Sequence, residues 1–235
     1  MKRANYGIDA LYIVKNLVFL SINIIIVSLI IYMKFSFGLF AIFLGLCGIA
    51  LLFKAILMLF TSKVSKLRQR KIVVNLGQLT GDEHILDIGC GRGLILNEAA
   101  RHLINGKAIG LDLWEGPDLS GNTKDAAVAN AKIENVLNKV EFVEGDARKL
   151  PFPASSFDVV FSSMALHNIP TEREKIKAIR EIVRVLKPNG RFVIQDIKST
   201  TLYYKVFQKA GVSEVQMKGP YFSMFPPVRI VVGRK

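Results

Sequence analysis

Two long stretches without a charged residue, both near the start of the chain, constrain its fold more than any other feature. Residues 16–33 are NLVFLSINIIIVSLIIYM and residues 37–53 are FGLFAIFLGLCGIALLF. With a few flanking residues, each reaches the roughly 20 residues that a helix needs to cross a bilayer core of about 30 Å. Only a short link around Lys34 separates them. We therefore expect a hairpin of two transmembrane helices, at about residues 12–33 and 37–60.

Two alternative structures are less compatible with these stretches. A pair of buried core helices is one alternative, but neither stretch has a polar face or an amphipathic period. A cleaved signal peptide is another, but the apolar part is too long, is doubled and lacks a small-residue cleavage pattern. We expect residues 1–60 to form a membrane anchor.

The positive charge of the chain is concentrated beside these stretches. The formal net charge is +13, and residues 1–71 hold ten Lys or Arg against one acid, which leaves +4 for the other 164 residues. Much of the excess lies in residues 61–79, which we predict to be a basic juxtamembrane stem helix. Such a segment is attracted to anionic lipid. The lipid bilayer is therefore the expected partner of the basic residues, and nucleic acid is not expected.

The distribution of basic residues also predicts an orientation. Basic residues flank both spans and only Lys34 lies in the link, so the positive-inside rule places both termini and the globular part in the cytoplasm. The two cysteines, Cys47 in the second span and Cys90 in a later turn, are not expected to pair. The absence of a disulfide framework agrees with a reducing compartment.

Residues 80–235 alternate between short apolar runs and amphipathic stretches, which is typical of a parallel sheet covered by helices on both sides. We predict strands at 84–88, 107–113, 140–145, 157–163 and 191–197. We predict helices at 94–103, 123–137 and 171–186, the last with Thr171 as its N-cap and with Pro188 and Gly190 as stop signals. Two further runs, 214–217 and 229–233, have no predicted helix between them and are expected to pair as antiparallel strands.

In a sheet of this kind, ligands bind beyond the carboxyl ends of the strands. The side chains that follow the predicted strands are mostly polar, and three carboxylates stand out. These residues are Asp87 with a glycine turn, Asp112, Trp114, Asp146, Ser162, Ser163, the segment MALHN, Gln195 and Asp196. The sequence therefore predicts a cleft rimmed by carboxylates, with one turn of open backbone.

The glycine turn itself, ILDIGCGRGL at residues 85–94, restricts the ligand. A dinucleotide fingerprint is G-x-G-x-x-G, whereas the spacing here is G-x-G-x-G and Leu94 stands where the third glycine belongs. This disfavours a dehydrogenase. Three acids without a nearby Walker lysine also disfavour a phosphate. A ligand with hydroxyls and an ammonium group fits better, and S-adenosylmethionine has both.

DIGCGRG at residues 87–93 matches D-x-G-x-G-x-G, the first motif of class I S-adenosylmethionine-dependent methyltransferases. GLDLW, EGDARKLPFPASSFDVVFSSMALHNI and EIVRVLKPNGRFVIQD resemble the later motifs, in the same order. The resemblance covers roughly residues 70–235 and is strongest to the ubiquinone/menaquinone C-methyltransferase-like branch. It implies an α/β fold: a Rossmann-like, doubly wound, mostly parallel seven-stranded sheet with an antiparallel last strand, here preceded by two transmembrane helices.

The same resemblance implies S-adenosylmethionine as the cofactor and assigns residues to it. The glycines would let the backbone approach the methionine and ribose. Asp87 would help to hold the ammonium group, Asp112 would accept from the ribose hydroxyls, and Asp146 would accept from the adenine amino group. The Ala147 backbone N–H would lie near the adenine ring, which Trp114 would cover unless it is a hydrophobic plug. The implied cofactor-binding residues are Asp87, Gly89, Cys90, Gly91, Gly93, Asp112, Leu113, Trp114, Asp146, Ala147 and Ser162.

Methyl transfer needs a base only where the acceptor must lose a proton. His167, in the MALHN segment, is the best-placed candidate, with a structural role in its loop as the alternative. No cluster of residues has metal-ligand spacing, so no metal is expected.

A methyltransferase with a membrane anchor suggests an acceptor in the membrane. We expect a small, lipophilic acceptor such as a quinone precursor, an isoprenoid or a phospholipid. The loop GPYFSMFPP at 219–227 would face that acceptor or the bilayer, unless it packs on its own domain. The alternatives are a soluble metabolite or protein as acceptor, with the anchor serving only localisation, and a non-catalytic cofactor-binding membrane module.

Overall fold

The computed structural model describes residues 3–34, 37–116 and 118–235. Its internal contacts divide the chain into two compact units. The hairpin unit comprises Gly7–Ser65 and Gly116–Ser120, and the α/β unit comprises the residues up to Tyr6, Lys66–Glu115 and Gly121–Lys235. The predicted stem, residues 61–79, is therefore divided, and most of it belongs to the α/β unit.

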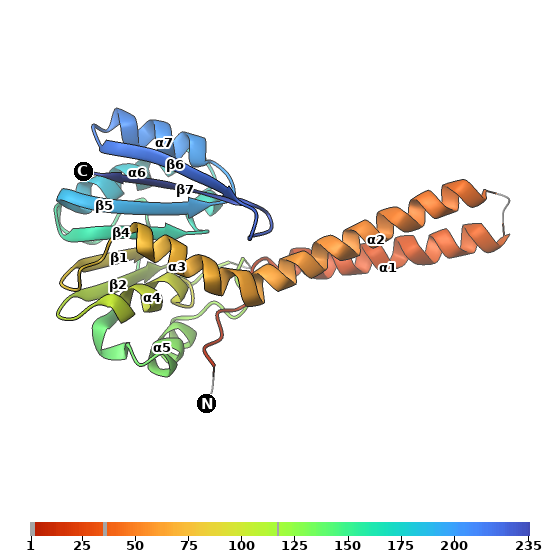
Figure 1. The fold of residues 1–235 in the computed structure, drawn as a ribbon, viewed down its shortest axis with the longest axis horizontal. Helices are drawn as coiled ribbons and strands as arrows, with labels where there is room; N and C mark the ends of the chain where they lie inside the picture. Colours follow the sequence, from red (N-terminus) through yellow and green to blue (C-terminus); the bar gives the residue numbers. More distant parts are fainter. Residues whose placement is uncertain (1–2, 35–36, 117) are drawn as a thin grey trace. The chain divides into compact units, whose positions relative to one another are not determined.

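The hairpin unit consists of two long helices side by side and a short π-helical turn (Figure 1). Its elements are α1 (Leu11–Lys34), α2 (Gly38–Phe60) and η1 (Thr61–Ser65). Small residues line the contact between the helices. The Ser21 hydroxyl donates to the Gly48 carbonyl at 2.8 Å, and the Ser28 hydroxyl donates to the Ala41 carbonyl at 2.6 Å. These residues allow the two backbones to approach closely without leaving a buried hydroxyl unsatisfied.

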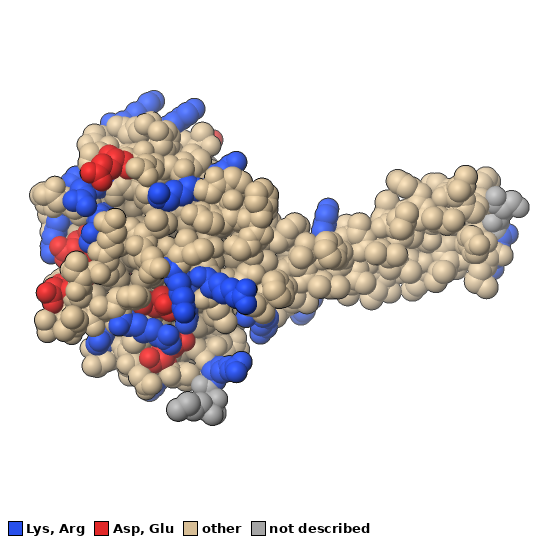
Figure 2. Space-filling model, in the orientation of Figure 1, with Lys and Arg blue, Asp and Glu red and all other residues tan. Residues whose placement is uncertain are grey.

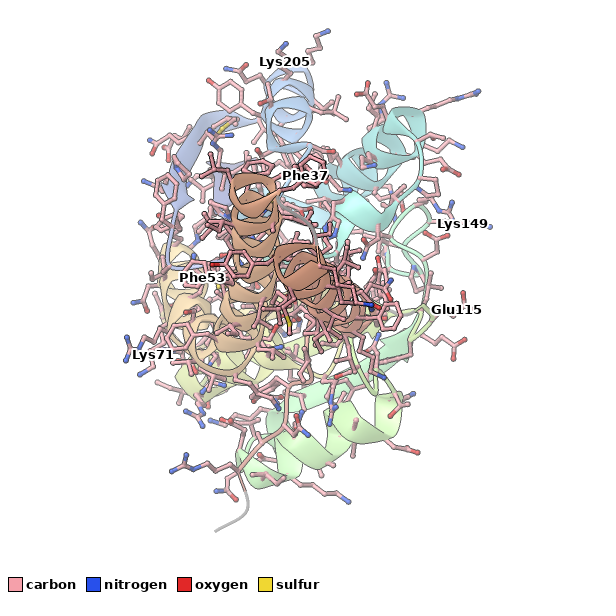
Figure 3. The ribbon with its side chains drawn as sticks, turned by 90° about the vertical axis from the view of Figure 1, so that its right-hand side faces the viewer. Phe37, Phe53, Lys71, Glu115, Lys149 and Lys205 are labelled. Carbon is pink, nitrogen blue, oxygen red and sulfur yellow. The ribbon has the colours of Figure 1, made fainter. Side chains whose placement is uncertain are left out.

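Apart from this contact, the hairpin presents apolar side chains outward. The side chain of Leu39 is 87% exposed, and those of Phe37 and Phe53 point away from the helices (Figure 3). Figure 2 shows few Lys or Arg and almost no acid on this surface. By length and composition, α1 and the helical stretch that contains α2 are apolar enough to cross a membrane, with mean hydropathies of 2.3 and 2.5. That they do so stays a prediction.

The α/β unit is built on a seven-stranded sheet with the order β3-β2-β1-β4-β5-β7-β6. Strands β1 to β5 pair in parallel, and β7 runs antiparallel to both of its neighbours. The strands are β1 (His84–Ile88), β2 (Lys107–Asp112), β3 (Val140–Glu144), β4 (Phe157–Ser163), β5 (Leu186–Asp196), β6 (Ser213–Tyr221) and β7 (Val228–Arg234). The predicted Rossmann-like, mostly parallel sheet with an antiparallel last strand is confirmed.

Helices cover both faces of this sheet. They are α3 (Lys66–Leu76), α4 (Leu94–His102), α5 (Lys124–Ile133), α6 (Glu172–Val185) and α7 (Thr200–Lys209), with 3₁₀ turns η2 (Leu137–Lys139) and η3 (Leu166–Asn168). Two buried apolar clusters fill the two interfaces. Leu96 of α4 packs in one, with Phe161 of β4, whereas Ile179 of α6 packs in the other, with Val160 of the same strand. Adjacent residues of β4 thus serve opposite faces, as alternation along a strand requires.

Two elements differ from the sequence prediction. Strand β5 begins at Leu186, so the LKPNG segment that was expected to follow a helix as a loop is the start of the strand. Leu186 is fully buried and pairs with Phe157, and a register shift after Phe157 accommodates the extra residues. Helix α7 was not predicted, although Tyr203 and Phe207 are spaced four residues apart and are both completely buried. The Thr171 N-cap is confirmed: its hydroxyl oxygen accepts from the Glu174 N–H at 3.2 Å.

Candidate cofactor and methyl-transfer site

The glycine turn after β1 is bonded directly to the end of β2. The Gly89 and Cys90 N–H groups donate to the Leu111 carbonyl at 2.7 and 3.1 Å. Gly89, Gly91 and Gly93 have φ values of +69°, +53° and +82°, which side chains of L-residues rarely adopt. At Gly89 a Cβ would also collide with the Cβ of Ala165, which follows β4. The turn therefore needs glycine at position 89 for its own packing, whether or not a ligand approaches it.

Asp112, the last residue of β2, organises this turn. Its Oδ2 accepts from the Gly91 N–H at 2.7 Å and its Oδ1 accepts from the Trp114 N–H at 2.7 Å. The Trp114 indole Nε1 donates in turn to the Gly91 carbonyl at 3.0 Å. Three predicted cofactor residues thus form one hydrogen-bonded group. The Asp112 carboxylate is partly exposed, and each of its oxygens retains a second lone pair for a ligand hydroxyl.

Trp114 and Leu113 lie in the loop that leaves β2. The Trp114 ring is partly buried, packs against the apolar cluster beneath α4, and has the Lys124 ammonium 5.9 Å from its centroid. Leu113 is 43% exposed, which makes it the freer apolar side chain of the two. Figure 3 shows Glu115 and Lys149, in the loops after β2 and β3, at one edge of this unit.

Asp87 lies beneath the glycine turn and is almost completely buried. Its Oδ2 accepts from the Leu96 N–H, in the first turn of α4, at 3.0 Å, whereas its Oδ1 has no hydrogen-bond partner among the described residues. Burial raises the pKa of the Asp87 carboxyl well above its usual range, and the nearby charge of Asp112 adds to this. A buried carboxylate with an unsatisfied oxygen fits a neighbouring positive group of a ligand.

Asp146, in the turn after β3, has a partner that the sequence did not predict. The Arg148 guanidinium contacts both carboxylate oxygens, with Nη2 2.6 Å from Oδ2 and Nε 3.0 Å from Oδ1. Arg148 holds the pKa of this carboxyl below its usual range and also bonds to Glu174 of α6 at 2.8 Å. The Asp146 carboxylate is thereby fixed in position, and an adenine amino group would have to share it with Arg148.

Ser162 and Ala147 occupy more structural positions. The Ser162 hydroxyl is buried and donates to the Ile88 carbonyl at 2.9 Å, which ties β4 to β1 just below the glycine turn. Ala147 is partly buried against the apolar cluster of the α6 face. Cys90 is buried within the turn, where burial raises the pKa of its thiol well above the usual range. None of these three side chains offers a charged group.

His167, in the η3 turn after β4, lies against Asp196, one of the polar residues at the predicted strand ends. Its Nδ1 is 2.6 Å from Asp196 Oδ1 at the end of β5, and no other described residue supplies a hydrogen bond to this nitrogen. The His167 N–H and the Tyr203 hydroxyl donate to Asp196 Oδ2 at 3.0 and 3.1 Å. Asp196 is completely buried, whereas the His167 side chain is 12% exposed. The carboxylate therefore fixes the orientation of the imidazole.

A second chain of polar side chains runs across the same edge of the sheet. The Gln69 amide, on α3, donates to Gln195 Oε1 at 2.8 Å, and the Gln195 amide donates to the Ser163 hydroxyl at 3.0 Å. The Ser223 hydroxyl, in the β6–β7 loop, donates to Gln69 Oε1 at 3.3 Å. Helix α3 and this loop are therefore fastened over the ends of β4 and β5. In the same loop Met224 is buried and Phe222 is 78% exposed.

The donor set at this edge suits an organic cation with hydroxyl groups. Across residues 3–34, 37–116 and 118–235, no group of three or more His, Cys, Asp or Glu side chains is placed to hold a metal ion. The buried acceptor of Asp87, the partly exposed carboxylate of Asp112 and the glycine turn between them match the ammonium and ribose groups of S-adenosylmethionine.

Known proteins match part of this chain in sequence. Residues 86–194 match a family model described as "Methyltransferase domain". The chain is 37% identical over 151 residues to a demethylmenaquinone methyltransferase of Lactococcus lactis, covering 62% of this chain and 55% of that protein. It is 33% identical over 133 residues to a sterol 4-C-methyltransferase of Caenorhabditis elegans, covering 54% and 35% of the two chains. The matched part thus spans about half of these relatives or less.

Solved structures show the same fold. A crystal structure of an S-adenosylmethionine-dependent methyltransferase from Aquifex aeolicus superposes with a TM-score of 0.57 at 17% identity, covering 74% of this chain and 92% of that one. At this level of identity the likeness concerns the fold alone. Residues 86–194 thus match a methyltransferase domain in sequence, and the α/β unit has the fold of an S-adenosylmethionine-dependent methyltransferase.

Proposed function

We propose that this protein is a membrane-anchored methyltransferase that transfers a methyl group from S-adenosylmethionine to a small, lipophilic acceptor, such as a quinone precursor, an isoprenoid or a phospholipid. One observation carries the proposal. A methyltransferase domain with an intact glycine turn and Asp112 is joined, in one chain, to two helices whose outward side chains are apolar.

The cofactor would be held at the ends of β1 and β2. Asp112 would accept from the two ribose hydroxyls through the lone pairs that Gly91 and Trp114 leave free. Asp87 would attract the ammonium group, because its buried Oδ1 otherwise has no partner among the described residues. This contact would compensate for part of the cost of burying the carboxylate.

The adenine would lie beyond β3. Asp146, fixed by Arg148, would accept from the amino group, and the Ala147 N–H would face the ring. The exposed side chain of Leu113 is the better candidate for contact with the adenine face, since Trp114 is already bonded to the glycine turn. Ser162 would contribute by holding the floor of the site rather than by direct contact.

The bound cofactor supplies an activated methyl group on a sulfonium, so the protein has to align the acceptor, exclude water and manage one proton. His167 is the proposed base: its Nδ1 faces Asp196, which leaves Nε2 to take the proton from an acceptor hydroxyl. Asp196 would stabilise the imidazolium that forms, as a buried carboxylate beside a catalytic histidine does. When bound, the cofactor would supply its methyl group by direct in-line transfer to the acceptor.

The acceptor class follows from the relatives and from the anchor. The Lactococcus lactis and Caenorhabditis elegans relatives are named for demethylmenaquinone and a sterol, which are both lipophilic. Exposed Phe222 in the β6–β7 loop would add an apolar wall near the ends of β4 and β5. The basic residues that flank the two helices would keep both termini and the methyltransferase domain in the cytoplasm.

A labelled-methyl experiment tests this function. Membranes that contain the full chain are incubated with methyl-labelled S-adenosylmethionine, and the organic and aqueous extracts are counted. Label in the organic extract, lost in Asp112→Ala, is the expected result. Label in the aqueous extract alone would replace the lipophilic acceptor by a soluble one, and cofactor binding without any transfer to membrane extracts would favour a non-catalytic module.

A further inference from the structure

We propose that residues Asn5–Ala10, here called the N-terminal strap, position the two loops that hold S-adenosylmethionine, so that their contacts set the affinity for the cofactor. This inference rests on the cofactor site of the proposed function. It assigns a role to a segment that precedes the family match by some 75 residues and lies directly before α1.

The first half of the strap is bonded to the glycine turn through one buried amide. Asn130, on α5, is 2% exposed. Its Oδ1 accepts from the Asn5 N–H at 2.9 Å, and its Nδ2 donates to the Asn5 carbonyl at 2.9 Å and to the Arg92 carbonyl at 3.0 Å. Arg92 lies within the glycine turn, between Gly91 and Gly93. A single side chain therefore joins the strap to the turn that faces the cofactor.

Tyr6 extends this attachment to the helix that follows the turn. Its hydroxyl accepts from Asn97 Nδ2, on α4, at 3.3 Å and from Arg70 Nη1, on α3, at 3.3 Å. Its carbonyl accepts from the Lys66 ammonium at 2.8 Å. Tyr6 is 5% exposed, and burial raises the pKa of its hydroxyl, which therefore stays protonated at neutral pH. Through these hydrogen bonds, the strap is attached to α3 and α4 at a buried residue.

The second half of the strap is bonded to the loop that leaves β2. The Ile8 N–H donates to the Ser120 hydroxyl at 2.7 Å, and the Ser120 N–H donates to the Ile8 carbonyl at 3.0 Å. The Ala10 N–H donates to the Asp118 carbonyl at 2.7 Å. The strap thereby forms a short antiparallel pairing with residues 118–120. This loop begins with Leu113 and Trp114, so it is the loop of the proposed ribose and adenine contacts.

The packing at Gly7 shows how closely the strap and the loop fit. Gly7 has φ of +71°, and a Cβ added there would lie 2.7 Å from the Ser120 carbonyl oxygen and 2.8 Å from Leu119 Cδ1. A side chain at this position would have to displace the loop. Gly211, in the turn before β6, has a similar φ of +74° but no atom within 4 Å of an added Cβ. Alanine should therefore strain the backbone at both positions, but only at Gly7 should it also displace the loop.

Loops that are already ordered bind a ligand without losing further conformational entropy. The strap supplies that order to both cofactor loops in advance. We therefore expect that detaching it weakens S-adenosylmethionine binding about tenfold, because the loops must then be ordered by the cofactor itself.

Full-length protein in lipid nanodiscs is titrated with S-adenosylmethionine by calorimetry. Trp114, the chain's one tryptophan, reports the state of the loop by its fluorescence emission. The test variants are Gly7→Ala, with Gly211→Ala as its control, and Asn130→Ala, with Asn105→Ala as its control. Among the described residues, the Asn105 side chain has one hydrogen bond, which its Nδ2 donates to exposed Asp82 Oδ1 at 2.9 Å.

The expected result is a Kd about tenfold higher for Gly7→Ala and Asn130→Ala, with unchanged stoichiometry and a shifted Trp114 emission before cofactor is added. Both controls should bind as the unmodified protein does. A purely structural defect would instead lower the number of binding sites at constant Kd, and that result overturns the proposal, as do unchanged affinities. If Asn130→Ala does not fold, the Gly7 and Gly211 pair decides alone. Unmodified protein that binds no S-adenosylmethionine would refute the proposed function rather than the strap.

Discussion

The Asp112→Ala substitution separates binding of the cofactor from stability of the fold. In the structure, the Asp112 carboxylate accepts two backbone hydrogen bonds of 2.7 Å, from Gly91 and Trp114. In the proposed complex it would also accept two from the ribose. Alanine removes both acceptor oxygens and with them all four hydrogen bonds, while the glycine turn keeps its bonds to the Leu111 carbonyl.

The size of each effect follows from the kind of bond that is lost. A hydrogen bond to a charged group contributes about 1.5–3 kcal/mol, so losing both ribose contacts costs about 3 kcal/mol or more of binding free energy. This corresponds to a dissociation constant raised at least about a hundredfold. Trp114 is partly exposed, so its freed N–H can bond to water, whereas the N–H of buried Gly91 is left without its acceptor. We therefore expect the free energy of unfolding to fall by about 1–3 kcal/mol.

Asp158→Ala is the matched control for this experiment. Asp158, in β4, also accepts a backbone hydrogen bond, from the His84 N–H at 2.8 Å, and pairs with Lys187, but it lies at the other end of the strands. Its loss should lower the thermal midpoint of unfolding by an amount similar to that of Asp112→Ala and leave the Kd for S-adenosylmethionine unchanged. Calorimetric titration of both variants gives the answer. Equal affinity in Asp112→Ala and the unmodified protein would refute the ribose assignment.

Four further substitutions test other parts of the site. His167→Ala should lower kcat by about 10²–10⁴-fold and leave the affinity for the cofactor unchanged, and Asp196→Asn should lower kcat less. A kcat within a factor of two of that of the unmodified protein in His167→Ala would refute the assignment of His167 as the base. Burial raises the pKa of Asp87, so the folded protein favours the protonated carboxyl group. The contribution of this group to the free energy of unfolding is fully present below about pH 3.9, its pKa in the unfolded chain, and is lost as the pH rises through its pKa in the folded protein. Asp87→Asn should therefore raise the thermal midpoint at pH 7 while weakening cofactor binding, and a lower midpoint would contradict this account. Arg148 lowers the pKa of Asp146, whose contribution is present above about pH 3.9 and lost as the pH falls through the lowered folded pKa. Arg148→Ala should make thermal stability less sensitive to pH below about 4, and an unchanged acid profile would exclude the pairing as its cause.

The sheet could be predicted from the sequence because each strand is a short apolar run between turn residues. The first four strands lie where the pattern places them, within one residue at each end. The fifth strand begins earlier than predicted, because Leu186 is buried in the sheet and not at the end of a helix. Pro188 and Gly190 are tolerated among the first residues of this strand. Helix α7 was missed although its two buried aromatic residues have helical spacing.

The site could be predicted only as far as topology determines it. Carboxylates at the ends of adjacent parallel strands must share one edge, so the strand ends alone predict that Asp87 and Asp112 lie near each other. The contact between His167 and Asp196 follows from the same rule, since β4 and β5 are neighbours, but it needed the exact course of the η3 turn. The pairing of Arg148 with Asp146 depends on the turn geometry two residues away, which no periodicity encodes.

The packing of Ala165 against Gly89 changes the explanation of the glycine turn. From the sequence, the glycines were expected to let the chain bend sharply and to let a ligand approach the backbone. In the structure, Gly89 is also required because Ala165 occupies the space of its missing side chain. The sequence pattern therefore indicated the turn but did not reveal the contact with Ala165. Packing between residues 76 positions apart is not visible in a local motif.

The most direct measurement of the central claim places the acceptor in the same bilayer as the protein or in a different one. Full-length protein is reconstituted into vesicles that contain a membrane lipid extract, or into plain vesicles mixed with separate extract vesicles, and methyl-labelled S-adenosylmethionine is added to both. An anchored enzyme that reaches its acceptor within the membrane should label the organic fraction rapidly only when both share a bilayer. Equal labelling in the two arrangements, or none in either while the cofactor binds, would contradict the account.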